Sequence, residues 1–76
     1  MQAFIVIEIQ VNDQDITSTI VETETDYWVA QQKYHRILSY AAVSGLPTHS
    51  AVILSPYGDI IDKKSYNRRT SGGDEE

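Results

Sequence analysis

The chain has 76 residues, no cysteine and a net charge of −5. This length allows one domain with a thin core, and the lack of cysteine excludes disulfides and thiolate metal sites. No apolar run reaches the roughly 18 residues of a transmembrane helix. Residues 4–11 are too short, too polar and too poor in basic flanks for a signal peptide. We therefore expect a soluble intracellular protein.

The charge is unevenly distributed along the chain. Residues 1–32 carry −6, residues 33–69 carry +4, and residues 70–76 carry −3. Such a distribution either reflects solvated faces that differ in sign by chance or orients a partner electrostatically. We favour the first explanation.

The first third of the sequence predicts a β-hairpin. Apolar residues alternate through residues 3–11 with the period of a strand, and residues 16–24 are rich in the β-branched residues of a second strand. The polar segment 12–15 is typical of a turn. A loop of those four residues would pair Val6 with Val21.

The segment from Thr25 to Gly45 predicts a helix. Thr25 is the expected N-cap, with Thr23 as the alternative. Gly45 is expected to take the left-handed position after the helix, and Pro47 prevents continuation. The apolar residues at helical spacing define a buried stripe of Ala30, Tyr34, Ile37, Leu38 and Ala41.

A second hairpin follows the helix. Residues 49–55 are apolar on both faces, Pro56 and Gly58 mark a turn with a positive φ at the glycine, and Ile60 begins a strand that becomes polar. Strands that are apolar on both faces belong in the centre of a sheet, and polar strands suit its edges.

These elements predict an α+β fold, a two-layer ββαββ domain over residues 1–69. Its four-stranded antiparallel sheet has the order 2-1-3-4, with the helix packed on one face. Residues 70–76 are expected to form a disordered acidic tail. The core is expected to contain Tyr34, Leu38, Ile7 and Ile53.

The face of the sheet away from the helix is the expected interface. The four-residue loop places Phe4, Val6, Val21 and Thr23 there. The third strand adds either Val52 and Leu54 or Ala51 and Ile53. Because one helix covers one face, we expect this apolar patch to bind a protein partner or a second copy of the chain.

No motif points to catalysis, a cofactor or a metal. His35 and His49 lack the spacing of a zinc motif, and His49 is expected to cap the start of the third strand. Ser50 is adjacent to His49, but neighbours in a strand point to opposite faces. No glycine-rich phosphate loop is present. We therefore expect no enzyme, no cofactor, no metal and no small-molecule substrate.

Basic and aromatic residues interleave near the end of the chain, at Lys63, Lys64, Tyr66, Arg68 and Arg69. Such a pattern can bind nucleic acid, but in an acidic chain it better fits a solvated edge strand. We expect no nucleic-acid partner. Tyr27, Trp28 and Tyr40 are either surface anchors for a protein partner or covers for the ends of the core.

The segment 33–44, followed by Pro47, residues 49–51 and Gly58, resembles a set of small uncharacterised proteins. These are encoded among the structural genes of tailed phages and prophages of Gram-positive bacteria. The resemblance implies a phage context, in the host cytoplasm or in the virion, and no activity. Together with the pattern of elements, it favours a non-enzymatic interaction or structural module. The alternative is a small acidic inhibitor or regulator of a host protein or nucleic-acid enzyme.

Overall fold

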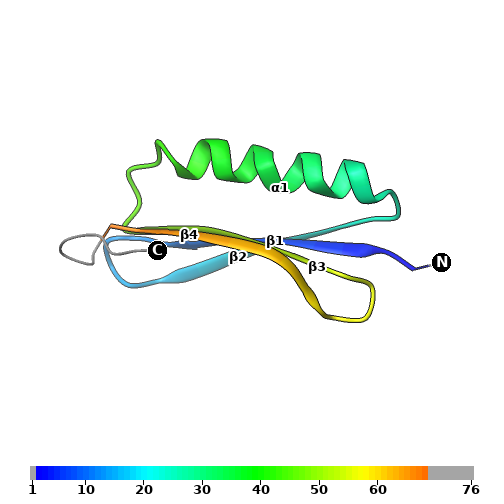
Figure 1. Cartoon of the computed structure of the whole chain (residues 1–76). Helices are drawn as coiled ribbons and strands as arrows, with labels where there is room; N and C mark the ends of the chain where they lie inside the picture. Colours follow the sequence, from blue (N-terminus) through cyan, green and yellow to red (C-terminus); the bar gives the residue numbers. More distant parts are fainter. Residues whose placement is uncertain (1, 69–76) are drawn as a thin grey trace.

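The computed structural model describes residues 2–68. Its elements in chain order are β1 (Phe4–Val11), β2 (Thr17–Glu24), α1 (Tyr27–Ala41), β3 (Thr48–Leu54) and β4 (Ile60–Asn67). The strands form one antiparallel sheet in the order β2-β1-β3-β4, with α1 across one face (Figure 1). The predicted α+β fold and strand order are thus confirmed. The predicted tail, residues 70–76, and the end of the domain at residue 69 lie outside the described residues.

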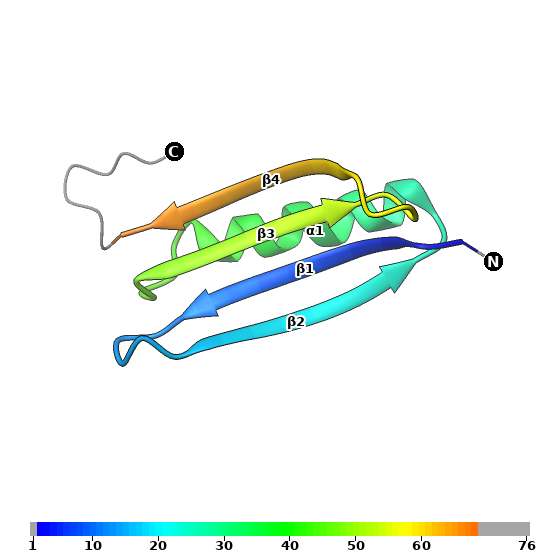
Figure 2. The same cartoon turned by 90° about the horizontal axis from the view of Figure 1, so that it is seen from below.

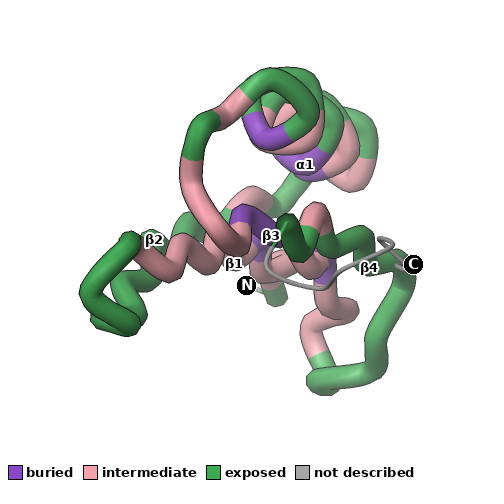
Figure 3. Tube along the Cα trace, turned by 90° about the vertical axis from the view of Figure 1, so that its left-hand side faces the viewer, coloured by how far each residue is buried: buried purple, intermediate pink, exposed green. Residues whose placement is uncertain are grey.

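The core lies between α1 and the two central strands (Figure 3). Its buried residues are Val6, Ala30, Tyr34, Ala51 and Ile53, and the partly buried residues Phe4, Ile37 and Leu38 pack against them. The predicted helix stripe is therefore correct. Tyr34 and Ile53 are core residues as expected, and Leu38 packs at the edge of the core. Ile7 is not part of this core, because it lies on the other face of β1.

Both hairpins close with the same loop geometry. In the first, Asn12 and Ile16 form a backbone hydrogen bond, and the Asn12 side chain accepts from the amides of Gln14 and Ile16. In the second, Ser55 and Asp59 form the corresponding bond, and the Ser55 hydroxyl accepts from the amides of residues 57 and 59. Each loop therefore has three residues between its closing pair.

The last residue of each three-residue loop takes a left-handed backbone conformation. Asp15 has φ 66° and Gly58 has φ 91°. The positive φ predicted for Gly58 is confirmed. The first loop, however, has three residues rather than the predicted four, because Asn12 pairs with Ile16 instead of lying in the loop.

The ends of α1 differ from the prediction. Asp26 is the N-cap in place of Thr25 or Thr23, because its carboxylate accepts hydrogen bonds from the amides of Trp28 and Val29 at 2.8 and 3.1 Å. The helix ends at Ala41 and not near Gly45, which has no positive φ.

The carbonyls at the C-terminal end of α1 are bonded in another way. The Arg68 guanidinium, at the end of β4, donates to the carbonyls of Ala41 and Ala42 at 2.7 and 2.9 Å. Residues 43 and 44 donate to the carbonyls three positions earlier, which tightens the last turn. The helix therefore needs no left-handed glycine to end.

Candidate functional site

The face of the sheet opposite α1 is uncovered within the described residues. Figure 2 looks onto this face, with α1 behind the sheet. The strand register places on it every second residue of each strand. The central strand β1 contributes Ile5, Ile7, Ile9 and Val11. Strand β3 contributes Thr48, Ser50, Val52 and Leu54; β2 contributes Thr17, Thr19, Val21 and Thr23; and β4 contributes Ile60, Lys63, Ser65 and Asn67.

Two of the four predicted interface residues are misplaced. Val6 is 1% exposed in the core under α1, and Phe4 packs against the same cluster. Val21, at 59% exposure, and Thr23 do share the uncovered face. Of the two sets left open for the third strand, Val52 and Leu54 are the ones on this face.

The physical reason is the three-residue loop. It pairs Ile7 with Val21 and Val6 with Glu22, whereas the four-residue loop would have paired Val6 with Val21. A one-residue change of register moves every side chain of one strand to the other face relative to its partner. The side chains of β2 therefore lie on the predicted faces of the sheet, whereas those of β1 lie on the opposite faces from the prediction.

This reversal leaves the more apolar side of β1 uncovered. The side under α1 carries Phe4 and Val6 at one end and Glu8 and Gln10 at the other, whereas all four uncovered positions are aliphatic. A single helix normally covers the most apolar face available to it. The structure therefore leaves the aliphatic side of β1 on the face away from α1.

The uncovered face is also free of negative charge. Among the described strand residues, the carboxylates are Glu8, Glu22, Glu24 and Asp62, and the register places all four on the α1 side. Asp62 reaches that side because the register shifts between Ile53 and Leu54, so that Ile61 is an extra residue in β4. Lys63 is the one charged residue that the described strands place on the uncovered face.

The uncovered face is not flat. A hollow of about 440 Å³ is lined by Ser50, Ala51, Val52, Lys63, Lys64 and Ser65. Four of these residues present their side chains on the uncovered side, and the hydroxyl of Ser50 donates to that of Ser65 at 2.9 Å. The small serines thus form a trough along β3 and β4, next to the ridge of aliphatic side chains on β1.

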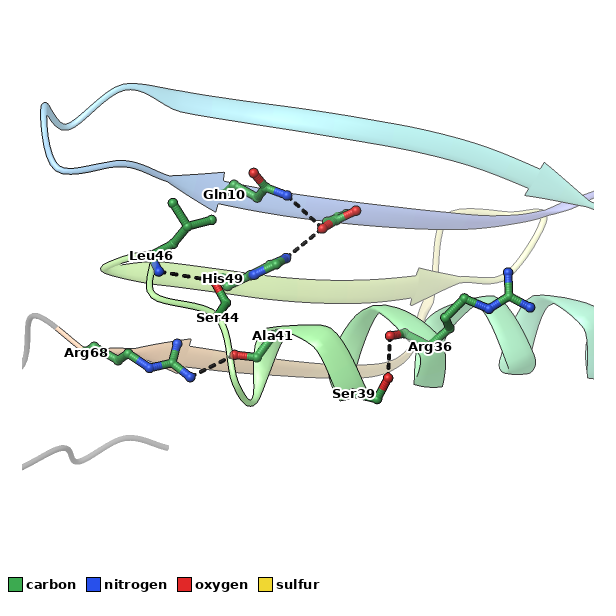
Figure 4. Close-up of polar contacts among 9 residues, drawn as sticks. Gln10, Arg36, Ser39, Ala41, Ser44, Leu46, His49 and Arg68 are labelled. Atoms are coloured by element: carbon green, nitrogen blue, oxygen red, sulfur yellow. Dashed lines mark hydrogen bonds and ion pairs between the residues drawn. The ribbon is translucent and has the colours of Figure 1, made fainter.

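A polar cluster lies on the other side of the sheet. His49 is 5% exposed, and its Nε2 lies 2.6 Å from a carboxylate oxygen of Glu8, which also accepts from the Gln10 amide at 2.8 Å. Figure 4 shows His49 on β3 and Gln10 on the neighbouring β1. His49 Nδ1 is buried without a hydrogen-bond partner. His49 is therefore a buried partner of Glu8 and not a cap at the start of β3.

Sequence reasoning missed this pair, although the signal was present. Glu8 and Gln10 interrupt an otherwise apolar strand, and a polar interruption in a central strand calls for a polar partner beside it. The predicted strand order places β3 beside β1, so His49 was the available candidate.

The cluster does not form a nucleophile or metal site in the described part of the chain. Ser50 and His49 point to opposite faces, as predicted. No group of three or more His, Cys, Asp or Glu residues within residues 2–68 could hold a metal ion. His35 lies on the exposed side of α1, where its ring contacts Tyr34.

Two further titratable groups have structural roles. Hydrogen bonds to Glu22 and then Glu24, at 2.7 and 2.6 Å, raise the pKa of the Lys33 ammonium and tie α1 to β2. Burial raises the pKa of the Tyr34 hydroxyl to about 12, and the nearby Asp62 carboxylate adds to this shift. Tyr34 therefore stays neutral in the core at physiological pH.

Of the basic residues near the C-terminal end, Arg69 lies outside the described residues, and Lys63, Lys64 and Arg68 do not form one patch. Lys63 points to the uncovered face, whereas Lys64 and Arg68 lie on the other side, 5.2 and 5.5 Å from the centre of the Tyr66 ring. Arg68 is also bound to the end of α1. These three residues of the described chain therefore do not line one continuous track for a phosphate backbone.

Tyr27, Trp28 and Tyr40, whose roles the sequence left open, differ in burial. Tyr27 packs edge-on against Phe4, with ring centres 5.4 Å apart, and covers one end of the core. Trp28 and Tyr40 are 74% and 64% exposed on α1. They lie on the helix layer and so do not contribute to the uncovered sheet face.

Comparison with protein-family models, with curated proteins and with solved structures finds no match to this chain. Within residues 2–68, no helix combines the length and the apolar character needed to cross a bilayer.

Proposed function

We propose that this chain is a non-enzymatic interaction module that works through protein–protein contacts on the uncovered face of its sheet. The observation that carries the proposal is the orientation of β1, which keeps Ile5, Ile7, Ile9 and Val11 out of the core under α1. Contiguous apolar patches on small domains mark interaction sites. The phage context implied by the sequence resemblance is part of the same proposal.

The alternative, an acidic inhibitor or regulator of a host protein or nucleic-acid enzyme, finds less support. An inhibitor that imitates nucleic acid needs carboxylates available to its target. Among the carboxylates of the described strands, Glu22 and Glu24 instead share the ammonium group of Lys33, and Glu8 is occupied by His49 and Gln10. The sheet face on which the described strands place no carboxylate is the better candidate for the interaction surface.

Site-specific photo-crosslinking tests the proposal. Benzoylphenylalanine is placed at position 21, on the uncovered face, and separately at position 40, a comparably exposed position on α1. The protein is then irradiated in the organism that encodes it, with and without phage growth. We expect a discrete covalent adduct with a protein of defined mass from position 21 and none from position 40.

The outcome against the proposal is equally clear. If position 21 gives no adduct under either condition, or if both positions give the same products, then the uncovered face is not a specific protein-binding surface. An adduct with any single protein, a second copy of the chain included, supports the proposal.

A further inference from the structure

We infer that the partner on the uncovered face is a second copy of the chain, packed face to face so that the ridge of β1 in each copy occupies the trough of β3 and β4 in the other. This inference rests on the proposed function and names its partner. It follows from the area, the shape and the charge of the uncovered face.

The area is sufficient for a weak dimer. Strands of eight residues at about 3.3 Å per residue, in a sheet of four strands about 4.8 Å apart, give a face of about 500 Å². Two such faces bury about 1,000 Å² in total, which is at the lower limit for a specific interface. We therefore expect self-association at micromolar rather than nanomolar concentration.

The shape of the face fits a dimer whose twofold axis runs parallel to the strands, between β1 and β3. The order β2-β1-β3-β4 places the two central strands on either side of that axis. Rotation then lays β1 of one copy over β3 of the other. Because Ile7 pairs with Val52 and Ile9 with Ser50 within one copy, each isoleucine faces the corresponding position of β3 in the other copy.

This arrangement is complementary in shape. Ile9 of one copy meets the hollow beside Ser50 and Ser65 of the other, and Ile7 lies against Val52, which lines the same hollow. A twofold interface repeats the same contacts in both directions. The outer strands then meet as well, with β2 of one copy opposite β4 of the other. These outer strands present mainly polar residues, and Val21 and Ile60 are their apolar members. An apolar centre with a mainly polar rim is the usual anatomy of an interface.

The charge also permits this packing. All four strand carboxylates point away from the second copy. The one charged strand residue on the face, Lys63, lies on the outer strand β4, where its long side chain can reach water at the rim.

Sedimentation equilibrium tests the inference. The wild type should dimerise at high micromolar concentration, and Ile7→Lys should raise the dissociation constant at least about thirtyfold, the change typical of a central interface residue. The matched control is Gln32→Lys, which adds the same charge on the exposed side of α1. Circular dichroism checks that both variants are folded. A wild type that stays monomeric, or equal effects of the two variants, would overturn the inference.

Photo-crosslinking of the purified protein tests the arrangement and separates this inference from the proposed function. From position 21, the covalent dimer should carry its link on β4 of the other copy, in the tryptic fragments 37–63 or 65–68. Sequencing of the linked fragment by mass spectrometry should place the linked residue between positions 60 and 67. A link at residues 17–24 would indicate pairing through β2 and would contradict the arrangement. If the purified chain gives no dimer while the cellular experiment gives an adduct with another protein, the second-copy inference fails and the proposed function stands.

Discussion

The last residues of the two hairpin loops need the same left-handed backbone, but different residue types supply it. Asp15 occupies this conformation in the first loop and Gly58 in the second. Aspartate tolerates the left-handed region better than most residues, and glycine does so without a steric penalty. A Cβ atom at Gly58 would meet no other atom within 4 Å, so the requirement at this position is one of backbone conformation and not of space.

Gly58→Ala should therefore destabilise the domain by about 1 kcal/mol, because alanine is strained at φ 91°. The matched control is Gly45→Ala, where φ is not positive and space is also open. This control should be neutral or slightly stabilising. Urea denaturation of both variants measures the difference. Equal effects would mean that the loop adjusts its backbone to relieve the strain.

The contact that His49 makes cannot be predicted from its neighbours in the sequence. Next to Ser50 it suggests a nucleophile pair, but the strand separates the two side chains onto opposite faces. Its actual partner, Glu8, is 41 positions away in the chain. Such a contact becomes visible only when both the strand order and the register are known.

At the scale of elements, alternation of apolar residues was enough to find the strands and their order. It was not enough to fix the register of the first hairpin, because Asn12 can either lie in the turn or pair with Ile16 as it does here. A period of two makes that difference decisive, since it exchanges the two faces of a strand. The misplacement of Phe4 and Val6 in the predicted interface follows from this one ambiguity.

The spacing of apolar residues also predicted the helix, but it did not fix the two ends of the helix. Its buried stripe follows from spacing alone, whereas its ends depend on competing caps. Thr23, Thr25 and Asp26 all have side chains that can accept from free amides. The carboxylate of Asp26 does so in the structure. The C-terminal end depends on Arg68, which no local pattern connects with Ala41.

Substitution at the N-cap tests this assignment. Asp26→Ala should lower the free energy of unfolding by about 1 kcal/mol, because two amides at the start of α1 lose their acceptor. Thr25→Ala is the control and should have little effect, since Thr25 is exposed and outside the cap. Thermal and urea unfolding measure both variants. If Thr25→Ala lowered the free energy of unfolding more than Asp26→Ala, Thr25 would be the N-cap, as the sequence predicted.

At the scale of the whole molecule, two kinds of self-association are physically available. One is the face-to-face packing inferred above, which is apolar at its centre. The other follows from the charge of the chain, because residues 1–32 are acidic and residues 33–69 are basic. The acidic half of one copy could then bind the basic half of another. The two differ in the sign of their response to salt.

Face-to-face packing should strengthen as salt is added. Each copy carries −5, so two copies with centres about 25 Å apart repel each other, and screening removes most of that repulsion. Between roughly 0.01 and 0.15 M ionic strength, the dissociation constant should fall about tenfold.

Sedimentation equilibrium across this range of salt measures the sign. Docking of the acidic half onto the basic half would weaken instead, because screening removes the attraction that drives it. A dissociation constant that rises with salt would therefore contradict an apolar interface on the sheet, whereas a fall would exclude docking of the acidic half onto the basic half as the source of the dimer.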